Sequence, residues 1–430
     1  MHHFQYHNKE MFCEDVPLAR IAQEVGTPFY AYSNATLRRH FGAFDEAFSG
    51  ISHMVCFSVK ANSNLAVLKV FANMGGGLDI VSGGELYRGL RAGVPPEKIV
   101  YSGVGKRVDE IEYALRSKIL MFNIESAQEL ERVNQCAGRL NTRARIALRV
   151  NPDVDPGTHP YISTGMKENK FGINRHAAIA TYKAAAELDH IDVAGIDCHI
   201  GSQLTDTAPF VEALQRIKEL IADLEGLGIS IQYLDLGGGL GITYDQEKPP
   251  HPDVYARAIV RELGDVPFTL ILEPGRVIVG NAGVLVTECL YVKNIEEKIF
   301  VVVDAAMNDL ARPSLYDAYH GIQPVIKDER PSFVADVVGP ICESGDSFAR
   351  DRMLPECRSG DLLAVMSAGA YGFTMSSNYN SRPRIPEVLV IEDRFYVVRE
   401  RETYADLIRG ESVPSFLQPA PEDLSGLSVA

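Results

Sequence analysis

The sequence predicts a barrel of eight parallel strands alternating with helices, joined to a second domain built mainly of antiparallel strands. Eight short apolar runs follow one another between residues 55 and 274, and helical patterns lie between them. After about residue 283, strand-like runs follow each other without long helices. A chain of 430 residues is also too long for one ordinary core. We therefore predict a (β/α)8 barrel over residues 36–282, and a β-sandwich or β-barrel domain formed by residues 1–35 and 283–430.

The eight runs are apolar almost throughout, as expected of parallel strands that are buried on both faces. In chain order they are Val55–Lys60, Leu78–Ser82, Ile99–Ser102, Ile119–Ile124, Arg145–Asn151, Val193–Ile200, Tyr233–Gly237 and Leu270–Pro274. With the intervening helices they occupy roughly 230 residues, close to the ~250 that a closed barrel of this kind takes. An open doubly wound sheet is the alternative, but no G-x-G-x-x-G pattern follows the first run.

The clearest helical pattern lies between the sixth and seventh runs. Apolar residues recur there at spacings of three and four, at Phe210, Ala213, Leu214, Ile217, Leu220, Ile221 and Leu224. Pro209 near its start and Gly226 and Gly228 after its end are typical of helix boundaries. The pattern therefore predicts an amphipathic helix between these two strands.

The second domain is predicted from short β-branched runs. They are Val284–Val292, Ile299–Val303, Phe333–Val338, Asp361–Met366, Glu387–Ile391 and Phe395–Val398. The segment Phe29–Tyr32 precedes the barrel and is also strand-like, so we expect it to join the later sheet. The tail from Pro414 to Ala430 is rich in Pro and Ser, and we expect it to be loosely ordered.

Composition excludes several classes of function. Hydrophobic residues make up 46% and charged residues 23% of the chain, as in soluble globular proteins. The formal charge of −15 argues against nucleic acid and acidic membranes as partners. No apolar stretch is long enough to span a membrane or to form a secretory signal. The seven scattered cysteines contain no CxxC pair, which favours free thiols in the cytoplasm, and we predict no metal site.

Polar residues stand where the runs end, and the active site of such a barrel forms at the C-terminal ends of its strands. Lys60 could be desolvated there, lose its proton and attack a carbonyl. Taken alone, a surface lysine at a strand end is the better explanation, because Lys is seldom buried. Asp79, His199 and Glu273 end other runs and favour the catalytic explanation. The sequence leaves open whether Asp79 contacts a ligand or only braces the barrel.

The glycine-rich segment Gly237–Gly241 could place backbone N–H groups around an anion, or could simply form a tight turn. With Lys60 and Ser202 it suggests a ligand that carries both a phosphate and a carbonyl, for which pyridoxal 5'-phosphate (PLP) is the obvious candidate. Glu273 could keep the pyridine nitrogen protonated. His199 could stack on the ring, although a hydrogen-bonded core histidine is the better explanation when its neighbours are left out.

Six longer segments lie between Thr27 and Arg384. They are Phe57–Asn62, Gly77–Leu86, Gly165–Gly172, His199–Gln203, Glu273–Arg276 and Cys342–Asp346. These segments resemble the fold-type III PLP-dependent enzymes, which have an alanine racemase-like barrel, and within them the diaminopimelate decarboxylases. The resemblance implies a homodimer with shared active sites, in which Cys342 and Glu343 reach the partner's cavity.

The resemblance also implies a role for individual residues. Lys60 would form the Schiff base with PLP and His199 would stack on the ring. The cofactor would further be held by Ser202, Gly237, Gly238, Gly239, Glu273, Gly275, Arg276 and Tyr371. The substrate would be bound by Arg276, Arg312 and Tyr316 at its distal carboxylate, by Glu343 at its distal amine, and by Tyr371. Cys342 would protonate the intermediate, with Lys60 as the alternative donor. A small buried hydrophobic residue is the alternative explanation for the Cys342 thiol.

The implied reaction converts meso-2,6-diaminopimelate to L-lysine and CO₂, the last step of lysine biosynthesis. Decarboxylases of ornithine or arginine share the fold, but they need acidic groups where Arg276, Arg312 and Tyr316 lie. A non-catalytic PLP-binding protein would be expected to lack the loop with Cys342. An amino-acid racemase would be expected to place an arginine, not Glu273, at the ring nitrogen.

Overall fold

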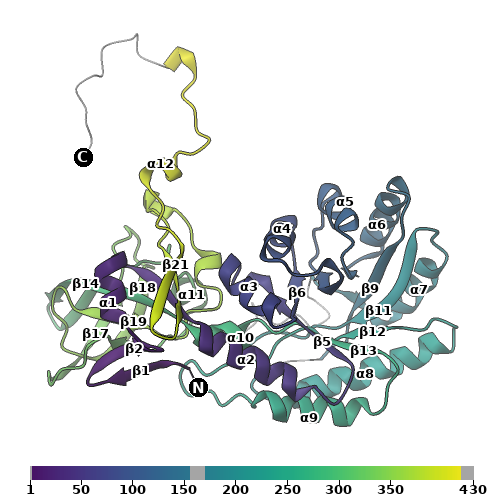
Figure 1. Cartoon of the computed structure of the whole chain (residues 1–430), viewed down its shortest axis with the longest axis horizontal. Coiled ribbons are helices and arrows are strands. Elements are labelled where there is room, and N and C mark those ends of the chain that lie inside the picture. Colours follow the sequence, from purple (N-terminus) through teal and green to yellow (C-terminus); the bar gives the residue numbers. More distant parts are fainter. Residues whose placement is uncertain (1, 155–169, 418–430) are drawn as a thin grey trace.

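In the computed structural model, which describes residues 2–154 and 170–417, the first large sheet closes into a barrel (Figure 1). Its parallel strands are β5 (His53–Ser58), β6 (Gly77–Ile80), β7 (Ile99–Tyr101), β8 (Met121–Ile124), β9 (Ala144–Asn151), β11 (Ile191–Asp197), β12 (Tyr233–Asp235) and β13 (Thr269–Leu272). Each strand pairs with the next, β13 pairs with β5, and β8 pairs with β9, so the ring is complete. A short strand, β10 (Ile173–Asn174), adds to the end of β9. The predicted closed barrel is confirmed.

The first strand ends earlier than predicted. β5 stops at Ser58, and Lys60 lies in the single 3-10 turn η1 (Val59–Ala61) that follows it. The turn carries the lysine beyond the hydrogen-bonded barrel, so the side chain stands above the strand ends. The apolar run itself could not reveal this, because Val59 is as buried as the strand residues before it.

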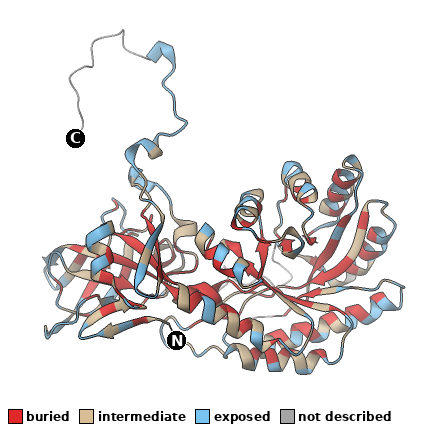
Figure 2. Cartoon of the chain, in the orientation of Figure 1, coloured by how far each residue is buried: buried red, intermediate tan, exposed pale blue. Residues whose placement is uncertain are grey.

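Helices surround the barrel. They are α2 (Asn34–Ala47), α3 (Leu65–Asn73), α4 (Gly83–Ala92), α5 (Val108–Ser117), α6 (Ala127–Arg139), α7 (Arg175–Ala186), α8 (Ala208–Glu225) and α9 (Pro252–Leu263). Helix α8 confirms the predicted amphipathic helix, and its seven predicted apolar residues are all buried. Figure 2 shows the buried residues on the strands and on the helix faces that meet them, with exposed residues on the outer faces. Within the described residues, the helices are too short or too polar to cross a membrane.

The second part of the molecule is a β domain beside the barrel (Figure 1). Its strands are β14 (Gly283–Ile295), β15 (Lys298–Val303), β16 (Ile322–Pro324), β17 (Ser332–Val338), β18 (Ser347–Pro355), β19 (Leu362–Val365), β20 (Glu387–Ile391) and β21 (Arg394–Arg399). Strand β4 (Phe29–Ser33) lies between β14 and β20, so the expectation that this segment joins the later sheet is confirmed. Most pairs are antiparallel, but β15–β17 and β4–β20 are parallel.

The sequence did not predict the strands β16 and β18. Strand β18 carries Arg350, Asp351 and Arg352 and lies at the edge of its sheet, so it lacks the apolar alternation of an inner strand. The first residues form β1 (Phe4–His7), β2 (Glu10–Cys13), β3 (Val16–Pro17) and α1 (Leu18–Val25). These elements cover one face of the β domain, where Met11 and Ile21 share a hydrophobic cluster with Val284.

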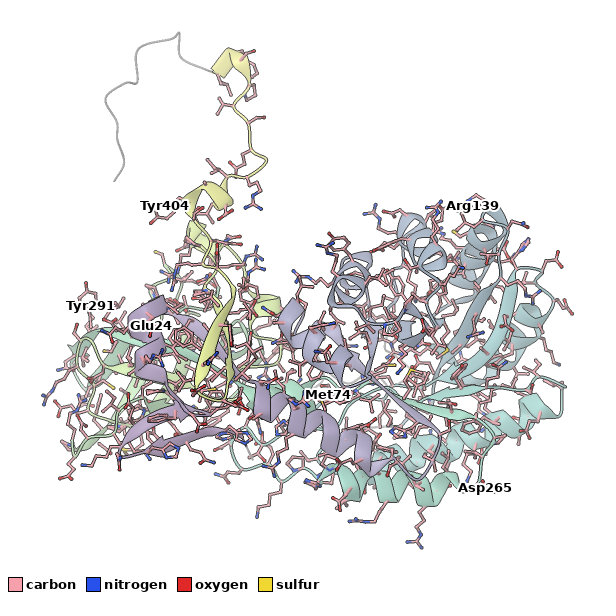
Figure 3. The ribbon with its side chains drawn as sticks, viewed as in Figure 1. Glu24, Met74, Arg139, Asp265, Tyr291 and Tyr404 are labelled. Atoms are coloured by element: carbon pink, nitrogen blue, oxygen red, sulfur yellow. The ribbon has the colours of Figure 1, made fainter. Side chains whose placement is uncertain are left out.

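Short helices complete the chain. They are η2 (Pro96–Lys98), α10 (Arg276–Val279), η4 (Gly280–Ala282), α11 (Arg312–Tyr316), η5 (Phe373–Met375), η6 (Tyr379–Ser381), α12 (Tyr404–Leu407) and η7 (Ser415–Leu417). The segment with α12 leaves the β domain, and Tyr404 on it is largely exposed (Figure 3). Two sequence predictions fall mainly outside the described residues: most of the Gly165–Gly172 segment and the tail beyond residue 417.

Candidate active site

A cavity of about 330 Å³ lies at the C-terminal ends of the barrel strands and is closed on one side by the β domain. Predicted site residues that line it are Lys60, His199, Ser202, Gly238, Gly239, Glu273, Gly275, Arg276, Arg312, Tyr316 and Tyr371. Gly237 directly precedes this lining. Residues far apart in sequence thus meet because the strand ends converge on one face of the barrel.

Lys60 meets Asp79 at the floor of the cavity. The lysine ammonium forms an ion pair with Asp79 Oδ2, and the aspartate side chain is completely buried. Ser58 Oγ lies 2.8 Å from the same carboxylate oxygen and 2.9 Å from the Glu273 carbonyl oxygen. The lysine itself is 38% exposed, toward the cavity. Asp79 therefore contacts the amine of Lys60, and does more than brace the barrel.

The charge on Lys60 differs from the sequence expectation. Burial opposes the ammonium charge, but the carboxylates of Asp79 and Glu273 outweigh it, so the pKa of Lys60 is raised above that of free lysine. Desolvation alone would remove the proton, as the sequence predicted for this amine. The ion pair with Asp79 instead favours the ammonium form of Lys60.

Glu273 belongs to a buried chain of polar groups across the barrel. Ser102 Oγ donates to Glu273 Oε1 at 3.2 Å, and Asn123 Nδ2 lies 3.1 Å from Ser102 Oγ and 3.2 Å from Asp235 Oδ2. Burial, together with Asp235, Asp79 and Asp197, raises the pKa of Glu273 well above its usual range. A cation placed beside Glu273 would therefore reduce the electrostatic repulsion among these buried carboxylates.

His199 is held neutral against the glycine segment. The Gly238 amide donates to His199 Nδ1 at 3.2 Å, which places the ring proton on Nε2. Burial and the nearby charges of Arg149 and Lys60 lower the pKa of His199 well below its usual value. The Gly237 amide is also engaged, since it donates to Asp235 Oδ1 at 2.9 Å. The amides of Gly237, Gly238 and Gly241, all in the segment that the sequence suggested as an anion nest, thus have partners within the protein.

Glycine is needed at these positions because the backbone approaches neighbouring residues closely, as well as because the chain turns here. A Cβ on Gly238 would lie 2.2 Å from the Glu273 carbonyl oxygen, and one on Gly237 would lie 2.5 Å from His199 Nδ1. Gly237 and Gly239 also have positive φ angles of 64° and 122°. The segment therefore packs against both the histidine and the last barrel strand, which a side chain would prevent.

Two arginines lie at the outer end of the cavity. Arg276 Nη1 donates to Tyr244 Oη at 2.7 Å and its Nη2 donates to Ser202 Oγ at 3.2 Å, while its buried Nε has no partner. Arg312 Nη1 donates to His320 Nε2. Among the described residues, neither arginine forms a salt bridge with an Asp or Glu. The cavity therefore holds two buried guanidinium groups without anionic partners.

Tyr371 enters the cavity from the β domain. Its amide donates to the Ala61 carbonyl oxygen at 2.8 Å, and Asn62 Nδ2 donates to the Gly369 carbonyl oxygen at 3.1 Å. Tyr371 has a positive φ of 55°, which is uncommon for a residue with a side chain. These bonds fix the loop of Tyr371 to the turn of Lys60, so the two domains are joined at the site itself.

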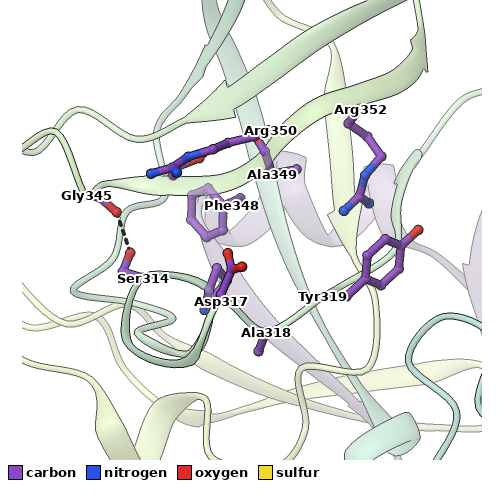
Figure 4. A pocket seen from close by; sticks show the side chains of 11 residues that line it. Ser314, Asp317, Ala318, Tyr319, Gly345, Phe348, Ala349, Arg350 and Arg352 are labelled. Carbon is purple, nitrogen blue, oxygen red and sulfur yellow. Dashed lines mark hydrogen bonds between the residues drawn. The ribbon is translucent and has the colours of Figure 1, made fainter.

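The structure does not bring Cys342 and Glu343 to this cavity. They lie exposed in the loop between β17 and β18, where Glu343 Oε2 accepts from Tyr379 Oη at 2.7 Å. Ser314, in the helix of Arg312, donates to the Gly345 carbonyl oxygen of the same loop at 2.7 Å (Figure 4). Their predicted catalytic and binding roles thus need a second chain and stay predictions.

Comparison with known proteins agrees with this geometry. Residues 34–280 match the family model of the pyridoxal binding domain of pyridoxal-dependent decarboxylases. A diaminopimelate decarboxylase from Pseudomonas aeruginosa is 54% identical over 410 residues, which cover 95% of this chain and 99% of that protein. The chain belongs to the diaminopimelate decarboxylase family. The predicted family, enzyme class and PLP cofactor are confirmed.

Solved structures of the diaminopimelate decarboxylase family have the same fold. The enzyme from Helicobacter pylori, complexed with L-lysine, matches with a TM-score of 0.89 and 43% identity over 91% of this chain and 98% of that one. The enzyme from M. jannaschii, also with L-lysine, matches with a TM-score of 0.92 and 39% identity over 96% and 99%. Both domains are therefore shared with diaminopimelate decarboxylases.

Several residues around the site were not assigned a role from the sequence. Gln203 and Tyr244 both line the cavity. Gln203 ends the selected segment His199–Gln203, and Tyr244 lies three residues beyond the selected segment Gly237–Gly241, so a short extension of that segment would have found it. His320 contacts Arg312 but shows no sequence pattern of its own. The Ser102–Asn123–Asp235 chain links three different strands, and only the closed barrel brings it together.

Proposed function

We propose that this chain decarboxylates meso-2,6-diaminopimelate to L-lysine and CO₂ with PLP held at Lys60. The observation that carries the proposal is the pair of buried arginines, Arg276 and Arg312, facing the same cavity as Lys60 without acidic partners. A substrate whose far end carries a carboxylate would supply the anionic partner that both arginines lack. A charged hydrogen bond of this kind contributes about 1.5–3 kcal/mol. Ornithine or arginine would leave both guanidinium groups unpaired and add a further positive charge.

The residues present suit PLP. Lys60 supplies an amine that suits the aldehyde, and Glu273 supplies a buried acid. A polar region that suits a phosphate is formed by Ser202, Gly239 and the Gly275–Arg276 segment. When bound, PLP supplies an aldehyde that captures amines and a ring that accepts the electron pair left when CO₂ departs. Glu273 would hold the proton at the pyridine nitrogen, and His199, kept neutral, would present its flat ring to the cofactor face.

The chain's own residues then divide the remaining tasks. Arg276, Arg312 and Tyr316 would bind the distal carboxylate, so that the other end of the substrate faces Lys60. Asp79 would hold the lysine amine beside the reacting carbon. Cys342 Sγ of a second chain would deliver the proton that replaces the lost carboxylate at Cα, and Glu343 of that chain would bind the distal amine.

We further propose a head-to-tail homodimer, a cytoplasmic location and the predicted domain limits. The exposed loop of Cys342 and Glu343, which does not line the cavity of its own chain, supports the dimer. The seven free cysteines support a reducing compartment. The pairing of β4 with β14 and β20 supports one β domain formed by residues 1–35 and 283–430, beside a barrel of residues 36–282.

The test is a turnover assay with purified protein and PLP. The substrates meso-diaminopimelate, ornithine and arginine are offered separately, and CO₂ and the amino product are followed. We expect lysine from diaminopimelate and no measurable product from the other two. Turnover of ornithine or arginine would refute the assignment of the arginines. PLP binding without any turnover would favour a non-catalytic protein instead.

A further inference from the structure

Arg276 and Arg312 share one aromatic ring. The Cζ atom of Arg276 lies 5.7 Å from the centre of the Tyr244 ring, and that of Arg312 lies 4.5 Å from it. The Tyr244 hydroxyl also accepts a hydrogen bond from Arg276 at 2.7 Å. The negative face of an aromatic ring stabilises a guanidinium group without cancelling its charge. Tyr244 thus contacts both like charges in the cavity.

His320 gives Arg312 a second neutral contact. The His320 side chain is fully buried, with Nε2 2.9 Å from Arg312 Nη1 and Nδ1 2.8 Å from the Met366 carbonyl oxygen. A carbonyl can only accept, so Nδ1 carries the hydrogen and Nε2 is left as the acceptor for the arginine. Burial and the charge of Arg312 lower the pKa of His320 to about 3, which keeps the ring neutral at neutral pH.

The segment that carries His320 is fixed from the opposite side. Arg352 of β18 donates to the His320 carbonyl oxygen at 2.8 Å, and its guanidinium lies 4.0 Å from the centre of the Tyr319 ring. Figure 4 shows Arg352 and Tyr319 together in a second hollow, of about 560 Å³, which shares Ala318 and Tyr319 with the active-site cavity. The wall between the two hollows therefore holds His320 in place.

Neutral contacts matter because a carboxylate partner would compete with the substrate. An Asp or Glu beside Arg312 would neutralise it and satisfy its N–H groups before the substrate arrives. Tyr244 and His320 orient the two arginines and leave their charges uncompensated. Burial and the nearby charge of Arg276 lower the pKa of Arg312, and an anion placed between the two guanidinium groups would oppose both effects.

We propose that Tyr244 and His320 are positioning residues. They orient Arg276 and Arg312 without neutralising them, so that both positive charges are available to bind the distal carboxylate of the substrate. The proposal rests on the proposed function, because the arginines need a substrate with a far carboxylate. It adds two residues to the specificity apparatus, both of which act through the arginines.

The test compares His320→Gln, His320→Glu and Tyr244→Phe in the PLP-loaded enzyme. Gln keeps an acceptor and a donor, whereas Glu supplies a negative charge. We expect His320→Glu to raise the KM for meso-diaminopimelate at least tenfold with kcat within threefold, and His320→Gln to recover most of the affinity. Tyr244→Phe should raise KM several-fold. His53→Gln, which replaces a partly buried histidine at the start of β5, is the matched control and should leave both constants unchanged.

A second readout is independent of turnover. Pimelate, a dicarboxylate of matching length, is titrated calorimetrically into each variant, and cofactor absorbance reports whether PLP is bound. Weaker pimelate binding in His320→Glu with normal cofactor absorbance supports the proposal. Equal affinities in His320→Gln and His320→Glu would overturn it. If His320→Glu does not fold, an unchanged KM and pimelate affinity in Tyr244→Phe would overturn it. Failure of the proposed function would be seen already in the wild type, as absence of lysine production.

Discussion

The ammonium group of Lys60 forms an ion pair with the buried carboxylate of Asp79 at the floor of the cavity. This pair keeps the amine protonated, while capture of an aldehyde requires the neutral amine. The contact that positions Lys60 should therefore slow the proposed reaction of its amine with free PLP.

Replacing Asp79 by Asn should allow Lys60 to react at lower pH. The pKa of Lys60 is raised by Asp79 against the opposing effect of burial, so removal of this charge lowers it. We expect the pH midpoint for PLP capture, followed by stopped-flow absorbance, to fall by about one unit or more. Ser58→Ala removes a hydrogen bond to Asp79 but keeps the charge, and should shift the midpoint much less. An unchanged midpoint in Asp79→Asn would contradict the role of the ion pair.

Glu273→Gln should slow the chemistry while PLP stays bound. An amide cannot balance a protonated pyridine nitrogen, so the ring becomes a weaker acceptor of electrons. We expect kcat to fall by about 10²-fold or more, as for loss of other acid–base groups. Absorbance of the bound cofactor checks loading, and Glu131→Gln on the outer face of α6 serves as the control. A variant with normal kcat would mean that Glu273 does not face the ring nitrogen.

Mixing two inactive variants should restore activity if the sites are shared. Lys60→Ala lacks the amine and Cys342→Ala lacks the proposed donor, so each homodimer has two defective sites. A mixed dimer has one site with both residues intact, and equal mixing should restore about one quarter of wild-type activity. Activity is measured after dissociation and reassociation of the two chains. No recovery, despite mixed dimers detected by mass spectrometry, would rule out a site shared in this way.

Asp309→Asn should stabilise the protein at neutral pH. Burial raises the pKa of Asp309 to about 7, so the folded chain keeps a proton that the unfolded chain releases. The free energy of unfolding of the wild type falls as pH rises from about 4 to 7, because the unfolded state binds fewer protons than the folded state over that range. A shift of this size corresponds to up to about 4 kcal/mol at pH 8. We expect the unfolding free energy of Asp309→Asn, measured by urea titration, to exceed that of the wild type by an amount that grows between pH 5 and pH 8. A difference that stays constant with pH would contradict this prediction.

The sequence predicted those parts of the site that follow from strand periodicity. Lys60, His199 and Glu273 end apolar runs, and a barrel brings the ends of such runs to one face. The ion pair with Asp79 could not be decided, because contact between neighbouring strand ends depends on side-chain direction and on the turn η1. His320 and Arg352 were invisible for a similar reason: their contacts join segments of the β domain with no repeating pattern.

The hydrogen bond from Ser314 to Gly345 links the helix of Arg312 with the loop of Glu343. In the proposed head-to-tail dimer, that helix serves the cavity of its own chain and that loop serves the cavity of the other. One hydrogen bond within a single chain would thus join the helix that lines one cavity to the loop that completes the other, so the two sites of such a dimer would be physically connected.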